Sequence, residues 1–132
     1  MRVLLVSPDA DARDLMRVAV GSLARRLGEP VSFVDASDGE RGAAVGLRER
    51  PDAIVADEIA SRAGAFSMAK DLRGAPKPYP GPIVIILDRK QDAWLARWSG
   101  ADAWFVKPVD PFELADRLVE LIRSRRNQEE TA

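Results

Sequence analysis

The chain has 132 residues, of which 46% are hydrophobic and 31% charged, and its formal net charge is -1. This size and composition fit one soluble domain, and the near balance of charge argues against a nucleic-acid binder that relies on a general basic field. Cysteine and histidine are both absent, which excludes disulfides, thiolate metal sites and hydrolases with a histidine base.

The first half of the chain predicts three strands separated by two helices. A first strand at residues 3–6 is followed by Asp9, which can cap a helix that runs to about residue 27 and ends at Gly28. The later elements of this half are a strand at residues 31–34, a weakly amphipathic helix at residues 38–48 and a strand at residues 53–56. Residues 3–6 and 53–56 are short continuous apolar runs, which are typical of parallel strands buried on both sides.

The second half repeats the alternation. A helix is expected over residues 65–73, and the proline-rich residues 74–82 that follow cannot be helical. The remaining elements are a strand at residues 83–87, a helix at residues 91–99 ended by Gly100, a strand at residues 103–106 and a helix from residue 110 to residue 122. Five strands alternating with five helices predict a doubly wound α/β fold, with one parallel sheet covered by helices on both faces.

The expected domain covers residues 1–122, and residues 123–132 form a polar tail that we expect to fray. The tail suits a linker, so the chain is either a stand-alone domain or the amino-terminal part of a longer protein. No apolar run approaches the roughly 20 residues that cross a bilayer, and no basic segment with a cleavage site opens the chain. We therefore expect a cytoplasmic protein without a membrane partner.

Asp57 and Lys107 are the most informative pair of residues. Each directly follows an apolar strand, and Pro108 follows the lysine. Ligands of doubly wound sheets bind beyond the carboxyl ends of the strands, so a carboxylate and an ammonium should stand together at the functional edge. Aspartate can act as a nucleophile that forms an aspartyl phosphate, and the pair therefore points to phosphoryl chemistry on Asp57.

From about residue 2 to residue 122 the chain resembles the receiver domain of bacterial two-component response regulators. Three patterns carry the resemblance: residues 3–6 with Asp9 and Arg13, residues 51–57, and residues 100–108. The resemblance implies a flavodoxin-like fold with sheet order 2-1-3-4-5 and a signalling module that is not an enzyme. It also implies that Asp57 accepts a phosphoryl group from a sensor histidine kinase and that Lys107 pairs with the phosphoryl oxygens.

The chain departs from the receiver pattern at three places. Ser7 and Pro8 stand where the family has the acidic pair that holds Mg²⁺. Leu87 stands where the family has a threonine or serine whose hydroxyl meets the phosphoryl group. Trp104 fills the aromatic switch position in place of the usual tyrosine or phenylalanine.

These departures leave the expected metal site incomplete. Mg²⁺ takes octahedral oxygen ligands, commonly one or two carboxylates and several waters, and Asp57 would be the only fully placed carboxylate. Asp9 and Asp88 are candidate substitute ligands. The alternative for each is a helix cap, and Asp88 could also repel a phosphate.

Leu87 cannot donate a hydrogen bond, which should weaken the coupling between the phosphoryl site and Trp104. Trp104 then acts through packing, or it is an ordinary aromatic at the sheet edge.

The partner surface is expected where Trp94 and Trp98 lie four residues apart on one face of the helix at residues 91–99. By resemblance, this helix with the last strand and last helix would meet a downstream protein or a second copy of the chain. The alternative is that Trp94 packs on the sheet and Trp98 lies under Arg97 or a loop.

These residues leave three candidate functions. The first is a phosphoacceptor switch with a degenerate metal site. The second is a pseudo-receiver, a protein-interaction module that works without phosphate. The third is an enzyme or cofactor carrier on the same fold, such as a flavin carrier, which the absence of a glycine-rich phosphate loop after residues 3–6 disfavours.

Overall fold

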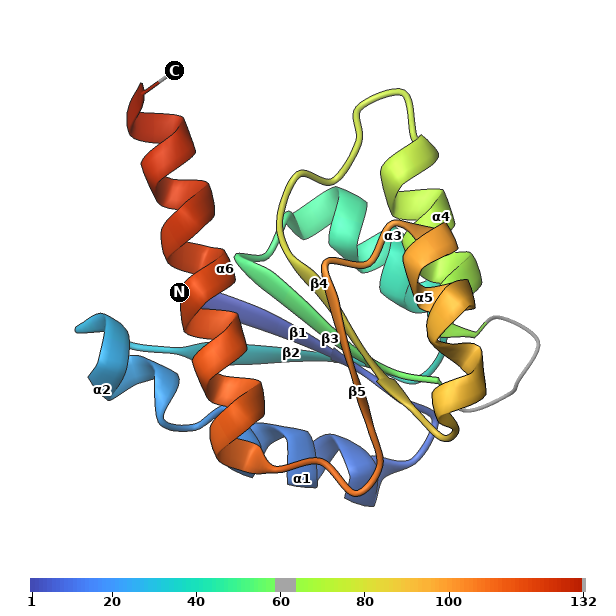
Figure 1. The fold of residues 1–132 in the computed structure, drawn as a ribbon. Helices are drawn as coiled ribbons and strands as arrows, with labels where there is room; N and C mark the ends of the chain where they lie inside the picture. The colour runs from blue at the N-terminus through green and yellow to red at the C-terminus, as the bar shows by residue number, and fades with distance from the viewer. Residues whose placement is uncertain (59–63, 132) are drawn as a thin grey trace.

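The sheet has five parallel strands in the order β2-β1-β3-β4-β5 (Figure 1). The computed structural model describes residues 1–58 and 64–131. The strands are β1 (Arg2–Val6), β2 (Ser32–Ala36), β3 (Ala53–Asp57), β4 (Ile83–Leu87) and β5 (Ala103–Val106). The predicted fold class and strand order are confirmed, and the bounds predicted for β4 and β5 are those observed.

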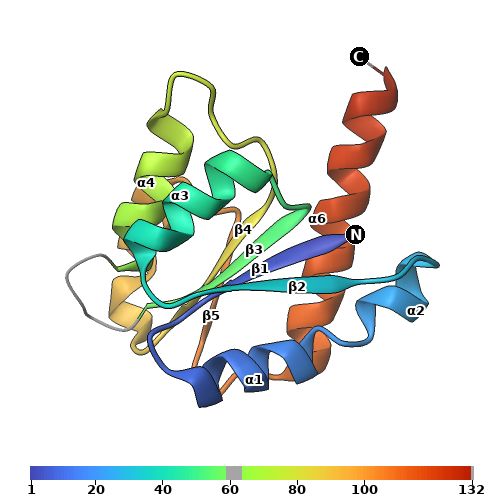
Figure 2. The ribbon, with the colours of Figure 1, turned by 180° about the vertical axis from the view of Figure 1, so that it is seen from behind.

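Helices cover both faces of the sheet, as Figures 1 and 2 show from opposite sides. They are α1 (Ala10–Ala19), α2 (Leu23–Leu27), α3 (Gly39–Glu49), α4 (Ala65–Gly74), α5 (Ala93–Ser99) and α6 (Pro111–Thr131), with a short 3-10 helix η1 (Lys90–Asp92) before α5. Successive strand residues point to opposite faces. Leu4 and Ile54 therefore pack with α3, α4 and α5, whereas Val3 and Val55 pack with α1, α2 and α6.

The single helix predicted from Asp9 to residue 27 is wrong, because the chain forms two helices, α1 and α2. The break falls at Gly21, a residue with low helix propensity. The turn keeps Val20 and Leu23 fully buried against the sheet, so burial of the apolar side takes precedence over continuity of the helix. The predicted stops at Gly28 and Gly100 are confirmed, and both adopt the left-handed conformation.

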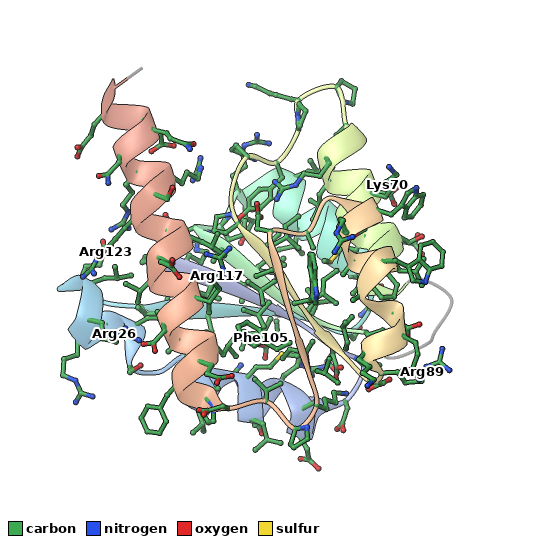
Figure 3. The ribbon with its side chains drawn as sticks, in the orientation of Figure 1. Arg26, Lys70, Arg89, Phe105, Arg117 and Arg123 are labelled. Atoms are coloured by element: carbon green, nitrogen blue, oxygen red, sulfur yellow. The ribbon has the colours of Figure 1, made fainter. Side chains whose placement is uncertain are left out.

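The prediction of a frayed tail is wrong for residues 123–131, because α6 continues to Thr131. Arg123 donates a hydrogen bond to the backbone oxygen of Arg26, which lies beside it in Figure 3. Arg125 pairs with Glu129 four residues on, at 2.9 Å, and an ion pair joins Arg126 to Glu29. Such pairs support helical polar segments. Ala132 lies outside the described residues, and the domain boundary at residue 122 stays a prediction.

Parallel pairing brings four strand ends to the same edge of the sheet. Val6 is paired with Ala56, Asp57 with Ile86, and Leu87 with Val106. The segments that follow β1, β3, β4 and β5 are therefore neighbours at this edge. None of the helices in residues 1–58 and 64–131 has the length and apolarity of a membrane span.

Candidate functional site

Asp57 and Lys107 meet at this edge, as the sequence predicts. Asp57 is the last residue of β3, and Lys107 directly follows β5. The Nζ atom of Lys107 lies 2.7 Å from Oδ1 of Asp57, and the Asp57 side chain is only 2% exposed. Burying a carboxylate is costly unless a cation is paired with it, and Lys107 is that partner.

Ser7 provides the second contact of Asp57. It is fully buried, and its hydroxyl donates to Oδ2 of Asp57 at 3.4 Å. The same hydroxyl oxygen accepts the backbone N–H of Asp9 at 3.2 Å. The place that holds an acidic residue in the receiver pattern thus holds a neutral hydroxyl, which binds the carboxylate directly.

Lys107 also contacts Asp88, which follows β4. Its Nζ lies 2.7 Å from Oδ1 of Asp88, the same distance as to Asp57. Burial lowers the pKa of Lys107, but the hydrogen bonds to Asp57 and Asp88 outweigh burial, and the net shift of this pKa is upward. The lysine therefore remains charged, and its charge is shared between two carboxylates.

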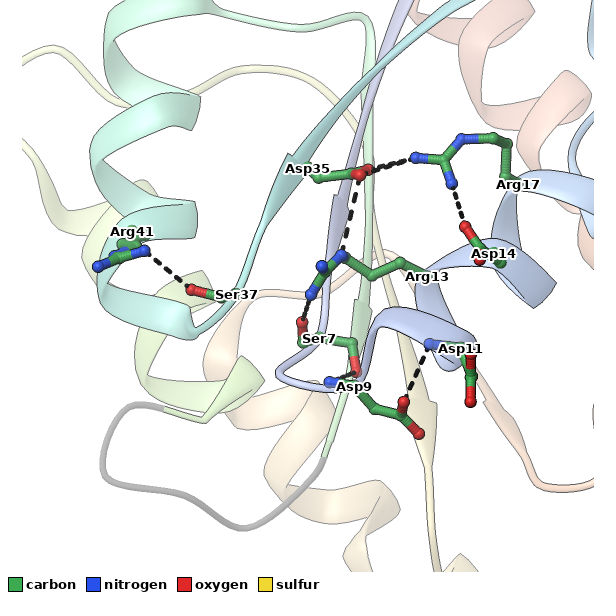
Figure 4. Close-up of polar contacts among 9 residues, drawn as sticks. All are labelled: Ser7, Asp9, Asp11, Arg13, Asp14, Arg17, Asp35, Ser37 and Arg41. Carbon is green, nitrogen blue, oxygen red and sulfur yellow. Dashed lines mark hydrogen bonds and ion pairs between the residues drawn. The ribbon is translucent and has the colours of Figure 1, made fainter.

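The helix-cap alternative is correct for Asp9 and wrong for Asp88. Oδ1 of Asp9 accepts the backbone N–H of Asp11 at 2.9 Å and caps α1 (Figure 4). Asp88 caps no helix, because the residue before η1 is Arg89 and no side chain caps η1. Asp88 instead forms the ion pair with Lys107.

Glu58 is a residue of this site that the sequence analysis missed. It follows Asp57, is 9% exposed, and its Oε2 accepts the backbone N–H of Asp88 at 2.7 Å. Burial, and then a hydrogen bond with Asp92, raise the pKa of Glu58 from 4.5 to about 7. The sequence contained a sign of this role, because Glu58 directly follows Asp57 and therefore also lies where β3 ends at the edge of the sheet.

This raised pKa predicts a specific pH dependence of stability. The folded state favours the protonated form of Glu58, so its contribution is fully present below pH 4.5 and is lost as the pH rises through about 7. Glu58→Gln keeps a group that can both donate and accept, and it cannot ionise. Urea unfolding at about pH 5 and about pH 8 should show wild type losing stability relative to this variant as the pH rises. An unchanged difference between the two proteins would contradict the assigned pKa.

Leu87 and Trp104 belong to the core on the α3, α4 and α5 side. Leu87 is fully buried, and Trp104 is partly buried and packs against the same cluster. The guanidinium carbon of Arg97 lies 5.7 Å from the centre of the Trp104 ring. At the end of β4 there is thus apolar packing where the receiver pattern has a hydroxyl.

Trp94 and Trp98 are both exposed, at 63% and 55%. The alternative that places Trp94 on the sheet and Trp98 under Arg97 is therefore wrong. Nζ of Lys70, labelled on α4 in Figure 3, lies 4.4 Å from the centre of the Trp98 ring. Two exposed tryptophans on a short helix make this face of α5 a candidate interaction surface.

A mainly apolar cavity of about 700 Å³ reaches the Asp57–Lys107 pair from the side of α1 and the start of α6. Its apolar lining includes Leu15, Met16, Ile86, Val109, Pro111 and Leu114. The sequence did not predict this cavity, because it depends on how α1 and α6 pack beside the edge of the sheet.

The comparisons with known proteins agree with the fold of the chain. The chain is 28% identical over 124 residues to an uncharacterized response regulatory protein of Mycobacterium tuberculosis, covering 94% of this chain and 92% of that protein. It is 30% identical over 128 residues to an uncharacterized 14.6 kDa protein encoded in the sodA1 3' region of Leptolyngbya boryana, covering 91% and 88%.

The receiver domain of the Francisella response regulator 1452 has a similar structure, with a TM-score of 0.78 at 21% identity, and the match covers 94% of this chain and 98% of that domain. No family model matches the chain.

Proposed function

We propose that the chain is a signalling switch of the receiver-domain type in which Asp57 accepts a phosphoryl group, in line with its 28% identity over 124 residues to a response regulatory protein and its likeness in fold to a receiver domain. The observation that carries the proposal is the 2.7 Å ion pair between Asp57 and Lys107 at the carboxyl edge of the sheet. The phosphodonor is a sensor histidine kinase or a small phosphorylated molecule, in keeping with the family.

The chemistry requires a nucleophile and a cation in contact. A carboxylate oxygen of Asp57 forms a bond to phosphorus as the bond from phosphorus to the donor's leaving group breaks, and the leaving group keeps the electron pair. Phosphoryl transfer depends mainly on positioning and on neutralising charge on the phosphoryl oxygens. Lys107 supplies a fixed positive charge for this purpose, and Ser7 orients the carboxylate.

The side chains present do not fit the usual Mg²⁺ site of the family. Pro8 has no ligand atom in its side chain, Ser7 supplies a neutral hydroxyl, and Asp9 is used as a helix cap. Asp88 is paired with Lys107. Within residues 1–58 and 64–131, no group of three or more acidic residues is arranged to hold a metal ion. We therefore propose that metal contributes little and that Lys107 carries most of the charge compensation.

The exposed face of α5 is the proposed output surface, which would contact a downstream protein or a second copy of the chain. Trp94 and Trp98 provide exposed aromatic area, which binding interfaces favour. Because both side chains lie at the surface, Trp98→Ala should weaken such an interaction with little change in melting temperature. A large fall in melting temperature would contradict the surface role.

A second candidate function is a phosphate-independent interaction module. Two observations favour it. Lys107 already forms an ion pair with Asp88, and the side chain at position 87 is a leucine without a hydroxyl. In this case the Asp57–Lys107–Asp88 contacts are structural and tie together the segments after β3, β4 and β5.

The test that separates the two candidates is incubation of the purified chain with acetyl phosphate, followed by mass spectrometry of the intact protein and of its peptides. The switch predicts one phosphoryl adduct on the peptide that contains Asp57, and its absence in Asp57→Asn. An adduct that persists in Asp57→Asn would place the acceptor elsewhere.

A further inference from the structure

A second concave site lies on the other side of the β1–α1 loop, between α1, the end of β2 and α3. Its volume is about 340 Å³, and its lining includes the guanidinium-bearing side chains of Arg13, Arg41 and Arg48 together with Asp35, Ala44 and Val45. We propose that this groove binds a small organic phosphate of about nucleotide size. The proposal is independent of phosphorylation at Asp57.

The positive charge of the groove is largely uncompensated. Arg48 is exposed and has no ion pair or hydrogen bond within the described part of the chain. The guanidinium of Arg41 contacts only the hydroxyl of Ser37, at 3.2 Å, among the described residues. The carboxylate of Asp35 is held by Arg17 through contacts of 2.6 and 2.8 Å, one to each oxygen. Two arginines therefore remain available to an anion.

Arg13 adds an unsatisfied donor. Its Nε is buried and has no hydrogen-bond partner among the described residues. The Oδ2 atom of Asp35, 3.8 Å away, forms an ion pair with this guanidinium but is too far for a hydrogen bond (Figure 4). A buried N–H without a partner is costly, and an acceptor oxygen from a ligand would satisfy it.

The spacing of the arginines sets the shape of the ligand. Arg41 and Arg48 are seven residues apart on α3 and share one face of the helix, with Ala44 and Val45 between them. Seven residues of helix span roughly 10 Å, which is too long for one phosphate. The small apolar side chains leave room for an uncharged body between the two cationic ends.

The chemistry of the groove favours an organic phosphate over other anions. Guanidinium groups form paired hydrogen bonds with phosphate oxygens, and such charge-assisted bonds are stronger than neutral ones. A volume of about 340 Å³ is near the lower limit of small-molecule pockets. A groove of this size can hold a nucleotide, whereas a protein segment needs a larger surface to bind stably.

The groove is connected to the candidate phosphoryl site through one side chain. Arg13 donates from Nη1 to the backbone oxygen of Ser7 at 2.5 Å (Figure 4). The hydroxyl of Ser7 in turn contacts Asp57. A ligand that draws on the Arg13 guanidinium therefore acts on the loop that carries Ser7.

The test is a ¹H–¹⁵N NMR titration of the intact chain with AMP as the probe, with adenosine as the matched uncharged molecule and inorganic phosphate as the anion alone. Saturable shifts are expected for the amides of Ser37, Ala44 and Val45, for Arg13 Nε and for the amide of Ser7. AMP should bind at least roughly tenfold more tightly than adenosine, because the phosphate contributes charge-assisted bonds.

Matched variants make the test specific. Arg41→Gln and Arg48→Gln should each weaken AMP binding by roughly tenfold. Arg25→Gln is the control, because Arg25 is an exposed arginine on α2 outside the groove, and AMP binding should not change.

The proposal is overturned if AMP gives no saturable shift at millimolar concentration, or if adenosine binds as tightly as AMP. It is also overturned if Arg25→Gln weakens AMP binding as much as the groove variants do, since the effect would then come from the loss of positive charge in general and not from the groove. Shifts in the groove caused by an oligoglutamate peptide and not by AMP would assign it to an acidic protein segment instead. Groove shifts without a Ser7 shift would contradict the connection to Asp57.

Discussion

Lys107→Ala is expected to lower the free energy of unfolding by about 2 kcal/mol, because it leaves the Asp57 carboxylate buried without a cation. Breaking a fully buried pair costs more, but the Lys107 side chain is 39% exposed, which reduces the loss. Asp57→Asn should cost less, since Lys107 keeps its contact with Asp88. Urea unfolding of both variants measures the two costs.

The control for this prediction is Lys77→Ala, which removes an exposed lysine without an ion pair among the described residues. It should change stability by less than about 0.5 kcal/mol. The double variant Asp57→Asn with Lys107→Ala should recover most of the stability lost in Lys107→Ala, because no buried charge remains unpaired. A double variant as unstable as Lys107→Ala would show that the loss comes from packing and not from the carboxylate.

Asp88→Asn is expected to increase the rate of phosphorylation of Asp57 about tenfold. Asp88 competes with an incoming phosphoryl group for Lys107 and repels its negative charge. Two like charges a few ångströms apart interact by a few kcal/mol at an effective dielectric constant of about 20. Removing this repulsion lowers the activation free energy of phosphoryl transfer, but Lys107 also loses a contact that holds it in place, which offsets part of the effect. The expected tenfold increase in rate corresponds to a net decrease of about 1.4 kcal/mol in the activation free energy.

The rate is measured from the growth of the phosphoryl adduct with a small phosphodonor. Asp71→Asn is the control, since Asp71 is exposed on α4 and has no ion pair within the described residues. A rate that falls in Asp88→Asn would mean that this carboxylate helps the reaction, as a metal ligand would. That result would restore the role that the sequence allowed for Asp88.

The fold could be predicted because strands buried on both faces leave continuous apolar runs in the sequence. Residues 83–87 are such a run and match β4 in full, and the apolar residues 103–106 match β5, although this edge strand is only partly buried. The meeting of Asp57 and Lys107 was predictable for the same reason, since each follows a strand and parallel strands end at one edge.

The features that sequence could not predict depend on contacts between distant segments. The turn at Gly21 combines the low helix propensity of glycine with the burial of both Val20 and Leu23, and the sequence alone does not reveal that burial. The continuation of α6 depends on contacts of its polar end with α2 and the following loop.

Within the site, the choice of partners was the unpredictable part. Asp9 and Asp88 are both acidic residues just beyond strand ends, and the sequence does not distinguish them. Only the geometry of the loops decides that one caps a helix and the other pairs with Lys107. The contact from Ser7 to Asp57 likewise requires the pairing of β1 with β3.

The central claim is that Asp57 accepts a phosphoryl group at a site where Lys107, and not a metal ion, supplies most of the positive charge. The most direct measurement is intact-mass spectrometry of wild type and Asp57→Asn after incubation with acetyl phosphate, in a series from excess EDTA to millimolar Mg²⁺. We predict an adduct on wild type that is absent in Asp57→Asn and whose rate of formation changes less than about threefold over the series. An adduct that forms only with Mg²⁺ would contradict the role given to Lys107, and no adduct under any condition would contradict the phosphoacceptor function itself.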